Sequence, residues 1–440
     1  MNLNTTVIAK IKIMKLEMKN IFIGLVLAST LAKAQVPSPA AIENSKVWIM
    51  AGTLHIGNGK VYTNASLRFD KGIITAIDSF RAPKDFPDHK IFLAKHVYAG
   101  LIAPNTTLGL NEVDAIRSTR DYNEVGQNNA NIRSLIAYNT DSKVIPTLRS
   151  NGILLAQITP SGGNISGQSS VVQLDAWNWE DAAIKVDDAL HINWPRMSLQ
   201  FGWGAESSEA EKGQIEMAIN AMNKIFSDAK SYCSSKGMEV NLKLEAFRGV
   251  FGGTKKVFVH TDGAREMISA VQFMQRYGIK PVIVGGDESH LITKFLRDNQ
   301  IAVILIRTHN LPSLPDDDID LPYKMPKILH DSGVLYCLAD VSAWQQRNLP
   351  FQAGTSVAFG LTAEQALMAI TKNTAEILGI SDKYGTLEVG KSATIIVSEG
   401  DILDMKSSKV TRAWIDGRPI DLDDTQKQLN RKYNTKYFGK

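Results

Sequence analysis

Polar side chains follow several apolar segments of this chain at the points where those segments end. Asn105 and Thr107 close one such segment, His260 closes a second and Asp340 follows a third. Imidazole and carboxylate groups are common metal ligands, and both can carry protons near neutral pH when their surroundings shift their pKa. These positions are therefore the first candidates for a site that binds a metal ion or transfers protons.

Three more side chains stand near the same segment ends. Arg307 and His309 follow the apolar run 301–306, and Arg347 lies seven residues after Asp340. Each arginine could bind a substrate carboxylate or stabilise an oxyanion, or could form an ion pair with a nearby acid. His309 could add an imidazole to the site, or could make a hydrogen bond to a loop backbone. Together with Asn105 and Thr107, these residues are the predicted substrate contacts.

The apolar segments that must position these groups alternate with longer stretches of helical periodicity. The predicted helices cover 209–236, 264–277 and 362–378, and Thr362 with Gln365 forms a capping-box pattern at the start of the last one. Such alternation favours a parallel α/β architecture. The predicted strands are 98–103, 153–158, 189–194, 256–260, 281–284, 301–306 and 334–339. An eighth strand, needed to close a barrel, is not evident.

Two further features of the middle of the chain have plain interpretations. The glycine-rich stretch 161–170 lacks the lysine of a phosphate-binding loop, so we expect a hairpin or lid at the barrel mouth. His191 lies inside an apolar segment, which favours a histidine whose polar atoms are satisfied within the barrel.

Both ends of the chain have a different texture. Residues 46–96 and those after 384 show short alternating strands separated by turn residues. Because the two parts share this texture and bracket the α/β region, we expect them to pair into one small β domain.

Four stretches resemble the amidohydrolase superfamily, most closely its imidazolonepropionase-like branch. They are 385–397 (GTLEVGKSATIIV), 361–367 (LTAEQAL), 371–379 (TKNTAEILG) and 98–102 (YAGLI). The resemblance implies an α/β fold, a TIM-like (β/α)8 barrel with a small β-sandwich built from the N- and C-terminal segments. The implied boundaries are 35–97 and 381–440 for the sandwich and 98–380 for the barrel.

The resemblance also implies metal-assisted hydrolysis, in which one or two divalent ions lower the pKa of a bound water and an aspartate moves the proton. The family carries Asp-x-His-x-His after its first barrel strand. Ala103, Asn105 and Thr107 stand at the matching positions, so both histidines are absent. Neutral oxygen ligands are too weak to hold zinc without imidazole or carboxylate help.

Two expected groups remain in the second half of the barrel. His260 matches the histidine of the fifth strand, and Asp340 matches the acid of the eighth. The next expected histidine falls on Gly285 or Gly286. His260 is then a metal ligand or electrophile, and Asp340 is the general base or a second ligand. The cofactor alternatives are one divalent ion, zinc, or none.

Two functions stay open at this point. The first is an exported hydrolase that cleaves a carbon–nitrogen bond in a small non-peptide or cyclic amide. The second is a barrel without catalysis that acts as a binding or assembly protein of the cell envelope. Loss of most metal ligands favours the second, whereas the family resemblance favours the first.

The first 34 residues predict a secretory signal peptide. Lysines precede the apolar run 21–31, and Ala32-Lys33-Ala34 offers small residues for cleavage before Gln35. This segment holds five lysines and one glutamate, so the remaining chain carries 44 basic and 44 acidic side chains. We therefore expect a periplasmic or secreted protein that binds a small molecule and no nucleic acid, with no transmembrane segment after cleavage.

Overall fold

The computed structural model describes residues 38–79, 89–197, 209–235 and 239–439. The chain divides into a unit Met1–Ser38 and a unit Pro39–Lys440, and everything below concerns the second. The predicted signal peptide lies outside the described residues.

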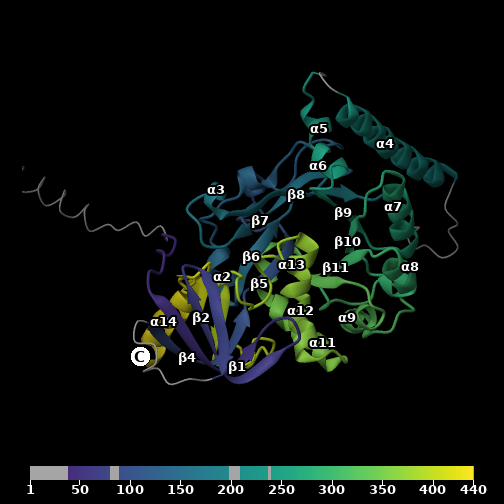
Figure 1. Ribbon diagram of the computed structural model, residues 1–440. Helices are drawn as coiled ribbons and strands as arrows, with labels where there is room; N and C mark the ends of the chain where they lie inside the picture. The colour runs from purple at the N-terminus through teal and green to yellow at the C-terminus, as the bar shows by residue number, and fades with distance from the viewer. Residues whose placement is uncertain (1–37, 80–88, 198–208, 236–238, 440) are drawn as a thin grey trace, which may run out of the picture. The chain divides into compact units, whose positions relative to one another are not determined.

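Strands from both ends of the chain form one seven-stranded sheet in the order β15-β14-β13-β4-β1-β2-β3. The C-terminal strand β13 pairs antiparallel with β4, with Ile396 opposite Tyr98, which confirms that the two ends pair. Figure 1 shows the yellow C-terminal segment beside the purple N-terminal strands. The predicted division into a two-layered sandwich stays a prediction. The strands are β1 Lys46–His55, β2 Val61–Asp70, β3 Ile73–Ser79, β4 His89–Ala99, β13 Ile395–Ser398, β14 Val410–Ile415 and β15 Arg418–Pro419.

A second sheet of eight strands follows the order β12-β11-β10-β9-β8-β7-β6-β5. Its first and last strands, β12 and β5, are neighbours, so the sheet forms a nearly closed barrel. A strand occurs at each of the seven predicted segments. The strands are β5 Leu101–Thr106, β6 Ile153–Ile158, β7 Ile165–Gln173, β8 Ala183–Asn193, β9 Lys256–Thr261, β10 Val282–Gly285, β11 Ala302–Ile306 and β12 Tyr336–Ala339.

The eighth strand, which the sequence did not reveal, is β7. It pairs antiparallel with both β6 and β8, whereas β8 to β12 are parallel to one another. The predicted hairpin after β6 is therefore present, but its second arm is a buried barrel strand, so the predicted lid is wrong for residues 165–170. Polar and small residues dominate this strand, which explains why it lacked the apolar run expected of a barrel strand.

Gly100 divides the predicted strand 98–103 between the two sheets. Tyr98 belongs to β4 of the first sheet, and Leu101 begins β5 of the barrel. A Cβ at Gly100 would lie 2.6 Å from Thr394 Cγ2 and 2.9 Å from Leu154 Cδ1. Only glycine therefore lets the backbone pass between the sheets at this point.

Helices cover the outer side of the barrel, and Figure 1 shows α7, α8, α9 and α11 around strands β9 to β11. No helix in the described ranges is long and apolar enough to cross a membrane. The α-helices are α2 Ile145–Ser150, α3 Trp179–Ala182, α4 Glu209–Ser234, α5 Leu242–Glu245, α6 Arg248–Phe251, α7 Ala264–Arg276, α8 Thr293–Asp298, α9 Leu321–Asp331, α10 Ser342–Gln345, α11 Leu349–Ala358, α12 Ala363–Ala369, α13 Lys372–Leu378 and α14 Thr425–Phe438; the 3-10 helices are η2 Arg117–Thr119, η3 Ser134–Ala137, η4 Ser289–Ile292 and η5 Gln346–Asn348.

The helix predicted over 362–378 is two helices, α12 and α13. The capping box of Thr362 and Gln365 is present at its start, as predicted. The helix is interrupted between α12 and α13 at Thr371, whose backbone is not helical. This break leaves the carbonyl of Ile370 free to accept a hydrogen bond of 3.0 Å from the Ile102 amide in β5. The Ile370 carbonyl therefore bonds to a barrel strand in place of an amide in a continuous helix.

A buried ion network ties the barrel to both ends of the chain. Asp175, just after β7, accepts from Arg149 in α2 at 2.5 Å and from Arg418 in β15 at 3.1 Å. The Asp175 side chain is 4% exposed and that of Arg149 is 8% exposed. The backbone amide of Ala40 donates to the same carboxylate at 2.9 Å. One carboxylate therefore bridges two guanidinium groups that come from distant parts of the chain.

We expect Asp175→Ala to lower the free energy of unfolding by about 3–5 kcal/mol, because it leaves buried positive charge without a partner. Urea denaturation followed by circular dichroism measures the loss. Asp298→Ala, which removes a solvent-exposed ion pair with Lys294, is the matched control and should cost far less. Equal losses in the two variants would contradict a structural role for the buried network.

Candidate active site

The predicted site residues lie at one end of the barrel sheet. Asp340 follows β12, Arg307 follows β11, His260 is the second-last residue of β9, and Asn105 and Thr107 stand at the end of β5. These strands run in the same direction, so their C-terminal ends meet at one mouth. In barrels of this kind the C-terminal ends of the strands carry the active site.

Asp340 is a buried carboxyl, 3% exposed. Its Oδ1 accepts from the Val341 amide at 2.7 Å, and its Oδ2 accepts from Gln352 Nε2. Burial raises the pKa of Asp340 to about 6, although the Val341 hydrogen bond and the charges of Arg307 and Arg347 act in the opposite direction. The carboxyl therefore titrates close to neutral pH, in the range that suits a general base.

Gln352 holds the ends of two barrel strands together. Its Nε2 donates to Asp340 after β12, while its Oε1 accepts from the Thr308 backbone amide at 2.8 Å and from the Thr308 hydroxyl at 3.3 Å. Gln352 is 1% exposed and lies on α11. Sequence reasoning missed this residue, because a glutamine inside a helix carries no motif.

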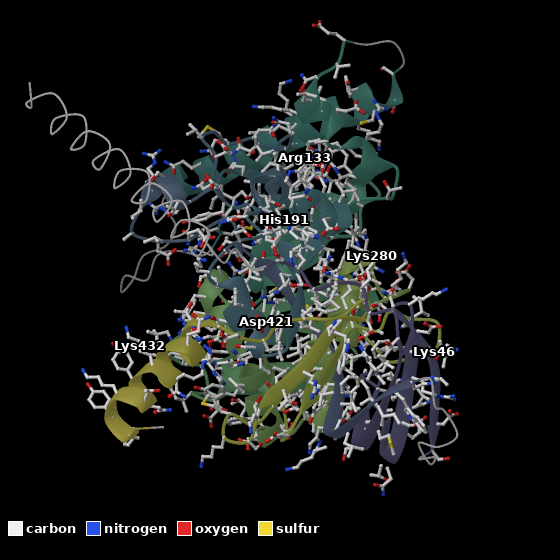
Figure 2. The ribbon with its side chains drawn as sticks, turned by 90° about the vertical axis from the view of Figure 1, so that its left-hand side faces the viewer. Lys46, Arg133, His191, Lys280, Asp421 and Lys432 are labelled. Atoms are coloured by element: carbon white, nitrogen blue, oxygen red, sulfur yellow. The ribbon has the colours of Figure 1, made fainter. Side chains whose placement is uncertain are left out.

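His260 contacts a histidine on the neighbouring strand. Its Nε2 lies 2.9 Å from Nδ1 of His191, which is fully buried and is labelled in Figure 2. Burial lowers the pKa of His260 to about 4 and that of His191 well below its usual range, so both rings are neutral at pH 7. The other nitrogen of His191, Nε2, is buried without a hydrogen-bond partner among the described residues. The prediction of a fully satisfied barrel histidine is therefore wrong for that atom.

Asp262 occupies the space beside Gly285. A Cβ built on Gly285 would lie 2.2 Å from Asp262 Oδ1, and the backbone of Gly285 has a φ of +103°. Partial removal from water and the charge of Asp287 raise the pKa of Asp262 to about 6. One of the two positions that match the absent family histidine, Gly285, thus lies against the acid that follows β9, and sequence reasoning did not single out this acid.

A second buried carboxylate lies inside the barrel. Asp188 accepts from Gln157 Nε2 at 2.9 Å and from Ser169 Oγ at 2.7 Å. Burial raises its pKa, against the effect of these two hydrogen bonds. The Asn105 amide donates to Gln157 Oε1 at 3.2 Å, and Asn105 has a φ of +49°. Asn105 is therefore fixed by its backbone to the interior polar network. Thr107 is half-buried one residue beyond the end of β5.

The other predicted contacts are held by local bonds. Arg307 donates through Nε to the His309 carbonyl at 3.2 Å, and His309 Nε2 lies 2.6 Å from the Thr355 hydroxyl on α11. Arg347 donates to the Trp344 carbonyl at 2.8 Å and stacks over the Trp344 ring. Both arginine charges reach Asp340, since both lower its pKa. Across the described ranges, no hydrogen bond or ion pair joins His260 to Asp340. Their roles in a common site stay a prediction.

Comparison with known proteins agrees with this geometry. Residues 329–420 match the profile of the amidohydrolase family. Amidohydrolase tasK from Hapsidospora irregularis is 20% identical over 424 residues, which cover 86% of this chain and 43% of the relative. The imidazolonepropionase of Shewanella sediminis is 24% identical over 193 residues, 43% of this chain and 41% of the relative.

These matches show that the chain is similar to amidohydrolases, with the family profile confined to residues 329–420. The crystal structure of an amidohydrolase from Thermotoga maritima has the same fold, with a TM-score of 0.74 and 21% identity over 85% of this chain and 99% of that one. The chain matches less than half the length of the two curated relatives.

Amidohydrolases generally depend on metal ions. The side chains at the barrel mouth can therefore be compared with the ligand set that a metal ion requires. Within the described residues, no group of three or more His, Cys, Asp or Glu side chains is placed to hold one ion. His260 Nε2 contacts another imidazole, and both oxygens of Asp340 accept hydrogen bonds. Zinc centres use at least three protein ligands. This donor set does not fit such a centre, and the predicted metal role of His260 and Asp340 has no support here.

We expect Gln352→Leu to lower the free energy of unfolding by about 2 kcal/mol, because it leaves the Thr308 amide and one Asp340 oxygen buried without partners. Leucine has a similar volume, so the loss reports hydrogen bonds more than packing. Gln428→Leu on the exposed helix α14 is the control and should change stability little. Urea denaturation of both variants tests this, and unchanged stability of Gln352→Leu would contradict the proposed strand link.

Proposed function

We propose that this protein hydrolyses a carbon–nitrogen bond in a small amide or cyclic amide. The observation that supports it best is Asp340, a buried carboxyl at the end of β12 whose pKa is raised to about 6. The similarity to the amidohydrolase family supports the reaction class, and the two curated relatives are an amidohydrolase and an imidazolonepropionase.

In this proposal Asp340 acts as the general base. Above pH 6 its carboxylate takes a proton from a water molecule as the water oxygen attacks the amide carbon. The resulting oxyanion carries a full negative charge, which the guanidinium of Arg307 would stabilise. Protonated Asp340 then returns the proton to the leaving nitrogen, and the carbon–nitrogen bond breaks.

The histidine pair would act as a neutral hydrogen-bonding group. At pH 7 both His191 and His260 are uncharged, so in this proposal His191 Nδ1–H donates to His260 Nε2 and the remaining N–H is that of His260 Nδ1. An N–H from His260 could polarise the substrate carbonyl without any change of charge. Asn105, Thr107, His309 and Arg347 remain proposed contacts to the substrate.

A barrel without catalysis, acting as a binding or assembly protein, is the alternative. The observation that favours it is the donor set at the mouth, which does not fit the family's metal centre. An activity measurement on purified protein distinguishes the two functions.

We expect the protein to hydrolyse members of a panel of small amides, releasing amine from linear ones and opening the ring of cyclic ones, with a rate that rises with pH through about 6. The sign follows because the base must be ionised, so the rate falls about tenfold per pH unit below its pKa. Asp340→Asn should lower kcat by about 10²–10⁴-fold and remove this pH dependence.

Asp316→Asn is the control, because Asp316 is exposed in an acidic loop. It should leave both rate and pH profile unchanged. Absence of activity on every amide, or full activity in Asp340→Asn with its fold intact, would contradict the proposed mechanism.

We also propose that the protein is exported to the periplasm or the medium after removal of residues 1–34. The support is the lysine-rich and apolar pattern that ends at Ala34. Expression of the full chain in a bacterial host, followed by cell fractionation and intact mass measurement, should give an extracytoplasmic protein that begins at Gln35. A cytoplasmic protein of full length would refute export.

A further inference from the structure

The backbone of Asp340 lies just beyond the end of the barrel sheet. The Arg307 amide donates to the Ala339 carbonyl at 2.9 Å, and the pairing of β11 with β12 ends there. Asp340 is the next residue and is buried, so its own N–H and C=O groups need partners outside the sheet. The carboxyl at the mouth is therefore carried by a backbone that the strand ladder no longer holds.

Gln346 supplies a partner for each of these two backbone groups. Its Oε1 accepts from the Asp340 amide at 3.3 Å, and its Nε2 donates to the Asp340 carbonyl at 2.7 Å. Gln346 is 0% exposed and is the first residue of η5. One side-chain carboxamide thus takes the place that a neighbouring strand would have.

The turn between Asp340 and Gln346 needs such an anchor. Ser342 has a φ of +60°, a left-handed conformation that is costly for a residue with a Cβ atom. Val341 is 39% exposed and Ser342 is exposed, so packing holds this part of the turn only weakly. Strained backbone persists where surrounding contacts over-determine it. The two bonds from Gln346 close the turn and oppose its relaxation.

The Asp340 carboxyl depends on the same backbone position. Its Oδ1 accepts from the Val341 amide at 2.7 Å, and its Oδ2 accepts from Gln352. Only one methylene group separates the carboxyl from the backbone, so a displacement of the turn moves both oxygens. Misplacement of a reacting group by about 1 Å can lower a rate 10²-fold. Gln352 thus holds the carboxyl itself, whereas Gln346 holds the chain that carries it.

We propose that Gln346 is a positioning residue for the hydrolysis, which fixes the Asp340 backbone so that the carboxyl can take a proton from the attacking water. This role rests on the proposed function, because Gln346 acts on the reaction only through Asp340. Within the described residues, Gln346 makes no hydrogen bond to the Asp340 carboxyl. Its loss should therefore lower kcat, whereas KM should change little.

Gln346→Met tests this role, because methionine is similar in length and volume but cannot donate to the Asp340 carbonyl. We expect kcat on the best amide substrate to fall by about 10²-fold. Gln345→Met is the matched control, because the Gln345 side chain accepts from Asn348 at 3.0 Å and not from Asp340. It should leave kcat unchanged. Full activity in Gln346→Met, or equal losses in the two variants, would overturn the positioning role.

Hydrogen–deuterium exchange of the peptide that covers residues 340–346 tests the anchor without any substrate. The Asp340 amide should exchange roughly tenfold faster in Gln346→Met, since losing a hydrogen bond raises local opening by that order, while β9 should exchange as in the parent. Unchanged exchange at Asp340 would overturn the anchor. Faster exchange with full activity would overturn the positioning role.

The two measurements also separate this proposal from the proposed function. A parent protein that hydrolyses no amide would overturn the proposed function and the catalytic part of the role together, whereas the exchange result by itself decides whether Gln346 anchors Asp340. Gln346→Glu is the second variant if the methionine variant folds poorly. Above neutral pH its carboxylate keeps an acceptor for the Asp340 amide but has no donor for the carbonyl, so kcat should fall again. Full activity in this variant would also overturn the role.

Discussion

The buried carboxylate of Asp175 is the constraint on which the arrangement of the chain depends. It accepts from Arg149 on α2 and Arg418 on β15, and from the Ala40 amide near the start of the described chain. Charge removed from water is costly unless it is paired and hydrogen-bonded, so these groups are stable only when all are in place. The barrel and the sheet made from both chain ends are therefore coupled, because each supplies part of the same network.

The same cost governs the polar groups inside the barrel. Asp188 is paired with Gln157 and Ser169, and Asp340 is paired with Gln352 and the Val341 amide. These hydrogen bonds do not fully offset burial, so both carboxyls keep a raised pKa. The pKa of Asp340, raised to about 6, lets this carboxyl exchange a proton near neutral pH. Asp340 lies at the barrel mouth, whereas Asp188 lies inside the barrel, where it accepts hydrogen bonds from Gln157 and Ser169.

Most of the barrel could be predicted from the sequence, because seven of its strands are apolar runs with clear ends. Strand β7 could not be predicted, because its serine, glycine and glutamine residues form no apolar run. Its polar side chains are buried and form hydrogen bonds inside the barrel, such as those of Ser169 with Gln157 and Asp188. The division at Gly100 depends on contacts with Thr394 and Leu154, which are remote in sequence. The positions of His260 and Asp340 at strand ends were foreseeable; their partners His191 and Gln352 were not, because neither follows from local spacing.

Gly285 limits which side chains the barrel can carry at the end of β10. The Asp262 carboxyl lies where any side chain at position 285 would begin, and the positive φ of Gly285 adds strain for every residue except glycine. A Gly285→His substitution would require the Asp262 side chain to move and the backbone at position 285 to change. A metal-binding side chain at position 285 therefore depends on residue 262 as well as on residue 285, and introducing one by design requires coordinated changes at both positions.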